Sequence, residues 1–174
     1  MSHSIESDQP IIVWFRDDFR LQDNPAFDAA VKTGQVIIPV FILEPKNRWS
    51  YGEASKLWLG ATLRQLSSEL EARGSYLVSL KGEPNTLLQL LIEKTNAHST
   101  YWNRRYDPSG VSVDKAIFSN LKSRCDVKSF KGRLLSEPTT LKSGAGTPYK
   151  VFTPFYKMCL RVGLDSSVSS PPDR

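Results

Sequence analysis

The segment that most constrains the fold is an apolar run that leads directly into charge and then into a helix start. Ile11–Phe15 is continuously apolar, and Arg16–Arg20 follows with four charged residues. Asp23, Asn24 and Pro25 then form the pattern of a helix cap with proline at the first helical position. This order predicts the strand–loop–helix unit of an open α/β sheet, in which ligands bind beyond the carboxyl ends of the strands. The loop contains no glycine, so it is not the Gly-rich cradle that binds a pyrophosphate.

Apolar runs and helical patterns alternate along the chain as far as residue 130. This alternation predicts βαβ units, and we expect an α/β fold. It should be a Rossmann-like open sheet of five mostly parallel strands with helices on both faces. The expected strands are Ile11–Phe15, Val36–Leu43, Tyr76–Leu80, Ser99–Trp102 and Val127–Phe130. The expected helices are Pro25–Lys32, Glu53–Arg73, Pro84–Lys94 and Ser109–Ser123, the last with Ser109 as its cap.

The composition is that of a globular protein and argues against several functional classes. Of the 174 residues, 40% are hydrophobic and 24% charged, which suffices for the core of one domain. No apolar run reaches the roughly 20 residues that span a bilayer, and no signal peptide is evident, so we expect a cytoplasmic protein. His3 and His98 have no evident partner, and Cys125 and Cys159 lack metal or redox spacing. A hydrolase or a metal centre built from these residues is therefore poorly supported.

Positive charge is concentrated in residues 100–160. This segment carries 11 Lys and Arg against 4 Asp and Glu, whereas the remainder carries 12 against 14, within a formal net charge of +5. A basic segment of this kind is compatible with nucleic acid nearby. It is equally compatible with a solvated basic face, or with a face that docks on an acidic neighbouring domain.

Two groups of polar and aromatic side chains follow strands that should end on the same edge of the sheet. Phe15–Arg20 ends the first strand, and Tyr101–Pro108 ends the fourth. Aromatic rings beside arginine suit a planar ligand, because guanidinium groups stack on π-faces and pair with anionic groups. The alternative is a set of salt bridges that fixes the loop itself, and both interpretations can hold together. In that alternative, Arg16 and Arg20 pair with Asp17, Asp18 or Asp23.

Aromatic residues outside the expected sheet gather in the segment Tyr149–Lys157. If exposed, they form an apolar patch of the kind that marks an interface. The alternative is ordinary packing across the open side of the sheet. Trp49 and Trp58 are expected to serve packing, and Ser166–Arg174 has the composition of a linker.

Three of these segments together resemble the amino-terminal domain of the DNA photolyase/cryptochrome family. Val13–Leu21 with Asp23–Ala26 is similar to the VWFRxDLRLxDNxAL motif of that family. Trp102–Pro108 resembles its WNRRYEP segment, and Tyr149–Phe155 resembles the YKVFTPF that leads out of the domain. Because the three motifs occur in the same order, their combination is far more specific than any one of them. The resemblance extends over nearly all of Ile11–Leu160.

The resemblance implies a domain organisation and a reaction. Residues 1–160 would be the photolyase-type α/β antenna domain, and residues 161–174 the start of an interdomain linker. Family members repair ultraviolet pyrimidine dimers with blue light, as deoxyribodipyrimidine photo-lyases, or act as cryptochrome light receptors. FAD and the lesion are held by a carboxy-terminal helical domain, which this chain lacks, so the chain alone is expected not to repair DNA. The expected partners are that helical domain and, through the parent protein, ultraviolet-damaged DNA, with no membrane and no obligate oligomer.

The resemblance also implies that this domain holds a second, light-harvesting chromophore. Folate-type members carry an Asn-Glu pair after the fourth-strand motif, where Ser109 and Gly110 stand here. We therefore favour 8-hydroxy-5-deazaflavin or FMN over methenyltetrahydrofolate, with an empty cleft as the alternative. The expected chromophore-binding residues are Phe15, Arg16, Asp17, Arg20, Leu43, Asn103, Arg104, Arg105 and Tyr106. The expected contacts to the helical domain are Lys150, Phe152, Phe155 and Tyr156.

Three hypotheses on function remain open at this point. The chain is the antenna domain of a photolyase, or the same domain of a cryptochrome, and nothing in these residues separates the two. The third hypothesis is a stand-alone nucleotide-binding α/β protein. That class would carry a Gly-rich phosphate loop, which the loop after the first strand lacks.

Overall fold

The computed structural model describes residues 9–45, 51–132, 134, 136–138, 140–144 and 146–163. The described chain divides into two compact units, one up to Gly132 and one beyond it. The expected domain boundary at residue 160 falls inside the last helix and stays a prediction. Within the described residues, no helix combines the length and the apolar character needed to cross a membrane.

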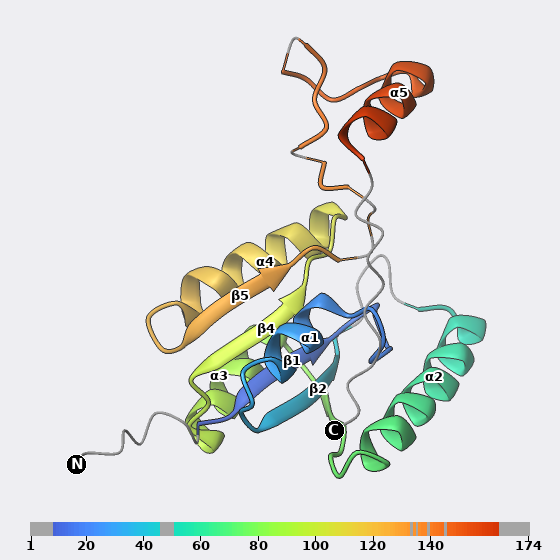
Figure 1. The fold of residues 1–174 in the computed structure, drawn as a ribbon. Coiled ribbons are helices and arrows are strands. Elements are labelled where there is room, and N and C mark those ends of the chain that lie inside the picture. The colour runs from blue at the N-terminus through green and yellow to red at the C-terminus, as the bar shows by residue number, and fades with distance from the viewer. Residues whose placement is uncertain are drawn as a thin grey trace. The chain divides into compact units, whose positions relative to one another are not determined.

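The first unit is a five-stranded parallel sheet with helices between the strands (Figure 1). The strand order is β3-β2-β1-β4-β5, and every pairing is parallel. The α/β prediction is therefore confirmed. The strands are β1 Ile11–Phe15, β2 Ile37–Leu43, β3 Val78–Lys81, β4 Ser99–Asn103 and β5 Asp126–Phe130. The helices are α1 Pro25–Val31, α2 Glu53–Glu71, α3 Pro84–Thr95 and α4 Pro108–Leu121.

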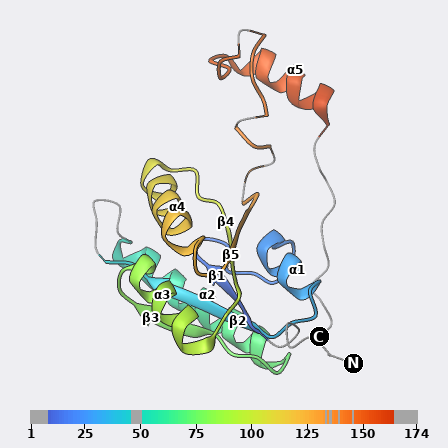
Figure 2. The same cartoon turned by 90° about the vertical axis from the view of Figure 1, so that its left-hand side faces the viewer.

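The sheet is buried on both faces, which explains why β1 is continuously apolar. Alternate β1 residues point to opposite faces: Ile11, Val13 and Phe15 to one, Ile12 and Trp14 to the other. The first face packs against α1 and the last turns of α2, and the second against α3 and α4. Figure 2 shows α1 and α4 on opposite sides of the sheet. Helices thus cover both faces of the sheet, as expected from the sequence.

The strand order places a topological switch point between β1 and β4. The chain moves outward from β1 to β2 and β3, and then crosses back to place β4 on the other side of β1. Trp14 of β1 and Trp102 of β4 are register partners, so the two strands end side by side. The connections that follow β1 and β4 lead away in opposite directions, and open α/β sheets bind ligands at such a point.

The helix starts follow side-chain capping, with one correction to the sequence analysis. Asn24 caps α1 as predicted: its side chain accepts a hydrogen bond from Phe27 N at 3.2 Å, and Pro25 occupies the first turn. For α4, the predicted cap Ser109 is wrong. Asp107 is the cap and accepts from Gly110 N at 2.8 Å, because Pro108 already fits the first helical position.

The second unit contains α5, Phe152–Val162, where the sequence analysis assigned no helix (Figure 1). None of its residues is buried. Among the expected interdomain contacts, Lys150 is exposed, Phe152 is 72% exposed and Tyr156 is 50% exposed. The rings of Phe152 and Tyr156 stack on each other with centroids 5.6 Å apart. The segment is therefore an exposed aromatic helix face.

The Asn24 side chain stabilises both α1 and the loop before it. Its amide donates to the carbonyls of Asp18 and Arg20, in addition to the capping bond. Asn24→Ser keeps a capping oxygen and loses both amide donors, so we expect a loss of about 1–2 kcal/mol in the free energy of unfolding. Asn24→Ala should lose about 1 kcal/mol more, the usual contribution of a cap. Urea unfolding measures both, and an unchanged Asn24→Ser variant would contradict the loop contacts.

Candidate functional site

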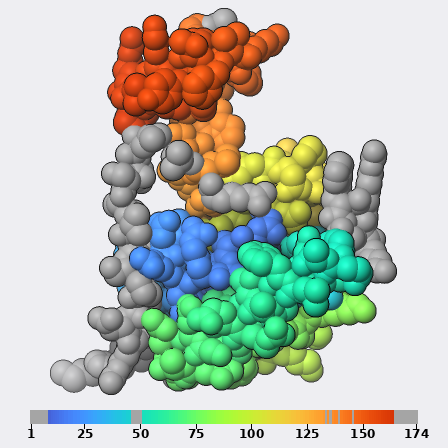
Figure 3. Space-filling view, turned by 90° about the vertical axis from the view of Figure 1, so that its right-hand side faces the viewer, coloured from blue at the N-terminus to red at the C-terminus, as the bar shows by residue number. Residues whose placement is uncertain are grey.

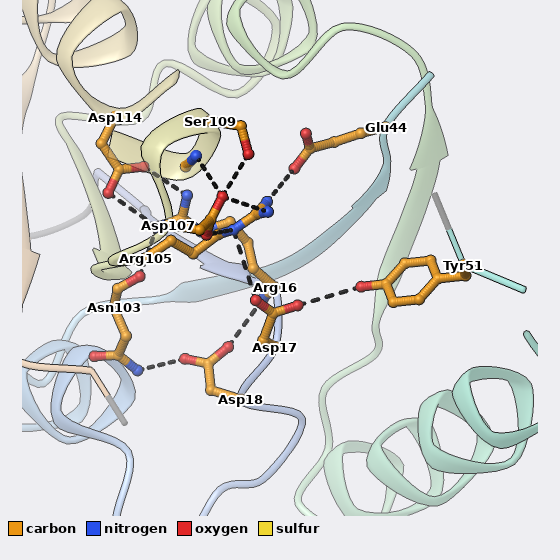
Figure 4. Close-up of polar contacts among 11 residues, drawn as sticks. Arg16, Asp17, Asp18, Glu44, Tyr51, Asn103, Arg105, Asp107, Ser109 and Asp114 are labelled. Atoms are coloured by element: carbon orange, nitrogen blue, oxygen red, sulfur yellow. Dashed lines mark hydrogen bonds and ion pairs between the residues drawn. The ribbon is translucent and has the colours of Figure 1, made fainter. Parts of the chain in front are cut away.

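Arg16, at the end of β1, is held by a buried ion pair (Figure 4). Its guanidinium donates to the Asp114 carboxylate of α4 at 2.5 and 3.2 Å, and to the Asn103 carbonyl oxygen at 2.6 Å. The Arg16 side chain is 4% exposed and that of Asp114 is 14% exposed. The guanidinium also lies 4.4 Å from the centre of the Trp14 ring. Arg16 therefore fixes β1, β4 and α4 to one another, so the salt-bridge interpretation holds for it, with a partner that the sequence analysis did not name.

Asn103 connects the end of β4 to the β1–α1 loop. Its amide nitrogen donates to the Asp18 carboxylate and, at 2.7 Å, to the side-chain oxygen of Asn24. Its own side-chain oxygen accepts from Ala26 N at 3.1 Å. Only 6% of Asn103 is exposed. All of these bonds lie within the protein, so Asn103 supports the edge of the sheet.

Arg105 lies at the centre of a cluster of three carboxylates, which we call the Arg105 cluster (Figure 4). Its guanidinium lies 3.1 Å from Glu44, 3.1 Å from Asp107 and 3.6 Å from Asp17. Tyr51 donates its hydroxyl to Asp17 at 3.2 Å. These residues follow three different strands, so the cluster gathers the loops at the carboxyl edge. Three carboxylates around one guanidinium leave an excess of negative charge.

The cluster shifts the pKa of several of its members. Burial raises the pKa of Glu44, and the Arg105 guanidinium only partly opposes this. Burial and the Asp17 carboxylate raise the pKa of Tyr51 to about 12. Burial lowers the pKa of Arg105, but its carboxylate partners raise it by more. Asp107 shifts the other way: burial raises its pKa, but hydrogen bonds from Ser109 and Gly110 and the Arg105 charge lower it to about 2.

Two glycines allow the backbone to approach these motif residues closely. A Cβ on Gly110 would lie 2.5 Å from the Arg105 Cβ, so a side chain there would displace Arg105. A Cβ on Gly132 would lie 2.5 Å from the Arg104 carbonyl oxygen. The Tyr106 hydroxyl accepts from Gly132 N at 3.2 Å. Arg104 and Tyr106 thus contact the segment that follows β5.

The structure brings together some of the predicted chromophore-binding residues and separates others. Asp17 and Arg105 meet in the Arg105 cluster, and Leu43, 38% exposed, precedes Glu44. Phe15 is fully buried in the core facing α1. The role of all nine residues in binding stays a prediction. Three further members of this edge were missed by the sequence analysis: Glu44, Tyr51 and Asp114.

Sequence signals for the missed residues were present but weak. Glu44 directly follows β2, so strand topology alone could have placed it on this edge. Asp114 is an acidic residue inside a helix, and only the helix position relative to β1 shows that it faces Arg16. Among the described residues, no group of three His, Cys, Asp or Glu side chains could hold a metal ion. The chemistry that the edge offers is ionic and hydrogen-bonding, with Leu43 and Tyr51 as its half-exposed hydrophobic surface.

Comparison with known proteins identifies the family. The sequence profile described as DNA photolyase matches residues 11–172. A deoxyribodipyrimidine photo-lyase from Agrobacterium fabrum is 46% identical over 149 residues, which cover 85% of this chain and 31% of the relative. Cryptochrome-2 from Arabidopsis thaliana is 37% identical over 175 residues, covering 98% and 28%. The chain spans about a third of the length of these relatives.

Solved structures of photolyases are also similar to this chain. The crystal structure of a class III photolyase from Agrobacterium tumefaciens has a TM-score of 0.90 at 42% identity, covering 98% of this chain and 35% of that chain. An archaeal photolyase from Sulfolobus tokodaii, solved with two FAD molecules, has a TM-score of 0.81 at 26% identity, covering 93% and 37%. This chain belongs to the DNA photolyase family and corresponds to its amino-terminal α/β domain.

The buried ion pair of Arg16 and Asp114 gives a prediction on stability. Asp114→Asn leaves a buried guanidinium without its counter-charge, and we expect a loss of about 3 kcal/mol in the free energy of unfolding. The double variant Arg16→Met with Asp114→Leu removes both charges and should be more stable than Asp114→Asn. Urea unfolding followed by circular dichroism measures both. A single variant within about 0.5 kcal/mol of the parent chain would contradict the structural role of the pair.

The lowered pKa of Asp107 gives a prediction on pH. Because the folded value of about 2 lies below the ordinary value of 3.8, ionised Asp107 stabilises the fold above pH 4, and this stabilisation is lost as the pH falls toward 2. Asp107→Asn keeps a capping side chain and removes the charge. Its deficit in the free energy of unfolding should be about 0.5–1 kcal/mol at pH 7, after allowance for solvent screening of this partly exposed group, and should shrink between pH 4 and pH 2. A deficit that is independent of pH would contradict this account.

Proposed function

We propose that the chain is the light-harvesting domain of a blue-light-dependent DNA photolyase and holds a chromophore at the carboxyl edge of its sheet. The observation that carries this proposal is the switch point between β1 and β4, with the Arg105 cluster beside it. The role of the domain would be physical: it holds a planar ring in a fixed orientation and shields it from water, while the light chemistry belongs to the chromophore. Arg16 and Asn103 would keep the edge rigid.

The remainder of the activity would lie in residues beyond this chain. Relatives named deoxyribodipyrimidine photo-lyase are about three times as long as the matched region, and the Sulfolobus tokodaii protein was solved with two FAD molecules. We therefore propose that FAD and ultraviolet-damaged DNA bind to a carboxy-terminal helical domain of the same protein. The α/β domain alone would then be inactive in repair, would be cytoplasmic and would need no obligate oligomer.

The exposed face of α5 supports a contact with that helical domain. Phe152, Phe155 and Tyr156 are 72%, 38% and 50% exposed, and they recur at the three- and four-residue spacing of one helix face. Large apolar rings gathered on a helix mark an interaction surface. Lys150 would flank this surface. The carboxy-terminal helical domain is the partner that we propose for this face of α5.

The charges at the edge narrow the class of chromophore. Arg16 and Arg105 are already bound to carboxylates, and the Arg105 cluster carries excess negative charge. A ring without a phosphate group fits such a site better than FMN does, so we place 8-hydroxy-5-deazaflavin ahead of FMN here. There is no room for a side chain beside Arg105 at Gly110, so this position cannot supply an additional carboxylate. Methenyltetrahydrofolate is included in the binding test described below, because its cationic bridge would be attracted by the same carboxylates.

The test of the chromophore site is a binding titration with matched variants. The chain is titrated with 8-hydroxy-5-deazariboflavin, FMN and methenyltetrahydrofolate, followed by absorption and fluorescence. Leu43→Asp places a further charge on the half-exposed edge, and we expect affinity for the deazaflavin to fall about 10-fold or more. Leu90→Asp, on the exposed surface of α3, is the control and should change nothing.

Two results would contradict the proposal. Equal affinity in Leu43→Asp and the parent chain would remove the chromophore from this edge. Failure of all three chromophores to bind would leave the domain without a light-harvesting role. The cryptochrome alternative is supported by the match to Cryptochrome-2 over 98% of this chain. Assay of the parent protein for repair of pyrimidine dimers under blue light separates the two: a cryptochrome would show none.

A further inference from the structure

The helix α2 carries apolar residues on two nearly opposite sides. One side is buried against the first unit and consists of Leu59, Leu66 and Leu70. The other side, which we call the outer strip, is exposed and consists of Ala54, Leu57, Trp58 and Ala61. The members of the outer strip recur at the i, i+3, i+4 and i+7 positions of one helix face. A surface helix normally has a single apolar side with a polar side opposite, so the outer strip is a second apolar face exposed to solvent.

The outer strip lies mostly on the first turns of α2, where the helix contributes nothing to the core. Every residue from Glu53 to Trp58 is exposed, and the first buried residue of the helix is Leu59. The side chain of Leu57 is 78% exposed and that of Trp58 is 62% exposed. Figure 3 shows α2, in teal and green, on the surface of the first unit. Large apolar side chains gathered on an exposed face mark an interaction surface.

The order of small and large side chains in the outer strip suits a second copy of the same strip. Leu57 and Trp58 occupy its centre, with Ala54 about one turn before them and Ala61 about one turn after. Reversing the direction of the strip exchanges the two alanines and leaves the large residues at the centre. Two copies of α2 can therefore meet antiparallel about a two-fold axis, with the large side chains of each copy against the small ones of the other.

The charges beside the outer strip also favour the antiparallel arrangement. Glu53 and Arg64 border the strip on the side of Leu57, and their separation of eleven residues corresponds to about 16 Å along the helix axis. In an antiparallel pair centred near Trp58, the same flanks of the two helices meet, so Glu53 of each copy lies opposite Arg64 of the other. A parallel pair would place Glu53 opposite Glu53. The contact of Glu53 with Lys56 does not prevent this, because the Glu53 side chain is 88% exposed.

We propose that the outer strip is the interface of a symmetric dimer, in which α2 packs antiparallel on α2 of a second copy of this chain. Leu57 and Trp58 form the apolar centre of the interface, and two Glu53–Arg64 pairs border it. Contact between two half-helices is smaller than a standard interface, so the dimer is weak and the chain folds without it. The outer strip shares no residue with the Arg105 cluster, and the proposal does not depend on the chromophore site.

The first test is sedimentation equilibrium of the chain over about a 100-fold range of concentration, which gives the dissociation constant of the dimer. Trp58→Ala should weaken the dimer about 10-fold or more, because a tryptophan at the centre of an interface usually dominates its affinity. Leu90→Ala is the matched control: Leu90 is 46% exposed on α3, and its variant should dimerise like the parent chain. Circular dichroism shows whether both variants keep the helix content of the parent chain.

The second test is charge reversal, which reports on the antiparallel orientation. Glu53→Arg and Arg64→Glu each place like charges opposite one another in both pairs, and each should weaken the dimer about 5-fold. The double variant that carries both changes restores opposite charges and should dimerise like the parent chain. A parallel pair has like charges opposite one another in the parent chain already, so neither single variant would weaken it.

Each outcome decides the proposal. A chain that stays monomeric at every concentration would overturn it and would leave the outer strip to another partner, such as the helical domain. A dimer that is lost in Phe152→Ala and kept in Trp58→Ala would also overturn it, because the contact would then lie on α5. Single charge variants that the double variant does not rescue would contradict the antiparallel pairing. A dimer weakened by Trp58→Ala and rescued by double charge reversal would support the proposal, whatever the chromophore titration shows.

Discussion

The ion pair between Arg16 and Asp114 is the interaction on which the carboxyl edge of the sheet depends. The guanidinium is almost completely buried, and burial of an unpaired charge would cost several kcal/mol. The Asp114 carboxylate of α4 and the Asn103 carbonyl of β4 together accept hydrogen bonds from its two terminal nitrogens. This geometry ties the ends of the two central strands to a helix on one face. The edge of the sheet at the switch point is therefore held in place before any ligand arrives.

The same arrangement divides the arginines of the loop motifs into different roles. Arg16 is internal to the fold, and Arg105 gathers three carboxylates from separate loops. Arg20 is half exposed and lines a different cavity, together with Arg73. Charge is thus distributed unevenly: excess carboxylate lies at the carboxyl edge, whereas the charged side chains beside α2 balance one another. The excess of carboxylate at the carboxyl edge is the physical basis for assigning a ring without a phosphate group to that edge.

Much of the fold could be predicted from the sequence, because its signals are local. The apolar run of β1 and the Asn24–Pro25 cap occur in the structure where the pattern placed them, and the alternation of strands and helices indicated a parallel sheet. Ser109 was mistaken for the cap of α4 because the apolar periodicity does not show at which residue the helix begins. Asp107, followed by Pro108 at the first helical position, is the cap. The helix α5 was missed in the sequence analysis, although Pro154 lies in its first turn, where proline is tolerated.

The site was predicted less completely, because its contacts are not local. The pairing of Arg16 with Asp114 spans 98 residues, and that of Arg105 with Glu44 spans 61. Sequence motifs placed the arginines near the edge but could not say which carboxylates would neutralise them. The expectation that Trp58 serves packing is wrong, because its side chain is 62% exposed, and only the position of α2 on the sheet decides which side of the helix is covered. Trp49 lies outside the described residues.

The most direct test of the central claim is to locate a bound chromophore on the chain by NMR. The backbone amides of the chain are assigned, and 8-hydroxy-5-deazariboflavin is added in steps. The account predicts that the largest shift changes occur at Leu43, Tyr51 and Arg105, at the carboxyl edge of the sheet. Changes confined to the opposite edge of the sheet or to α5, with none at these three residues, would contradict it.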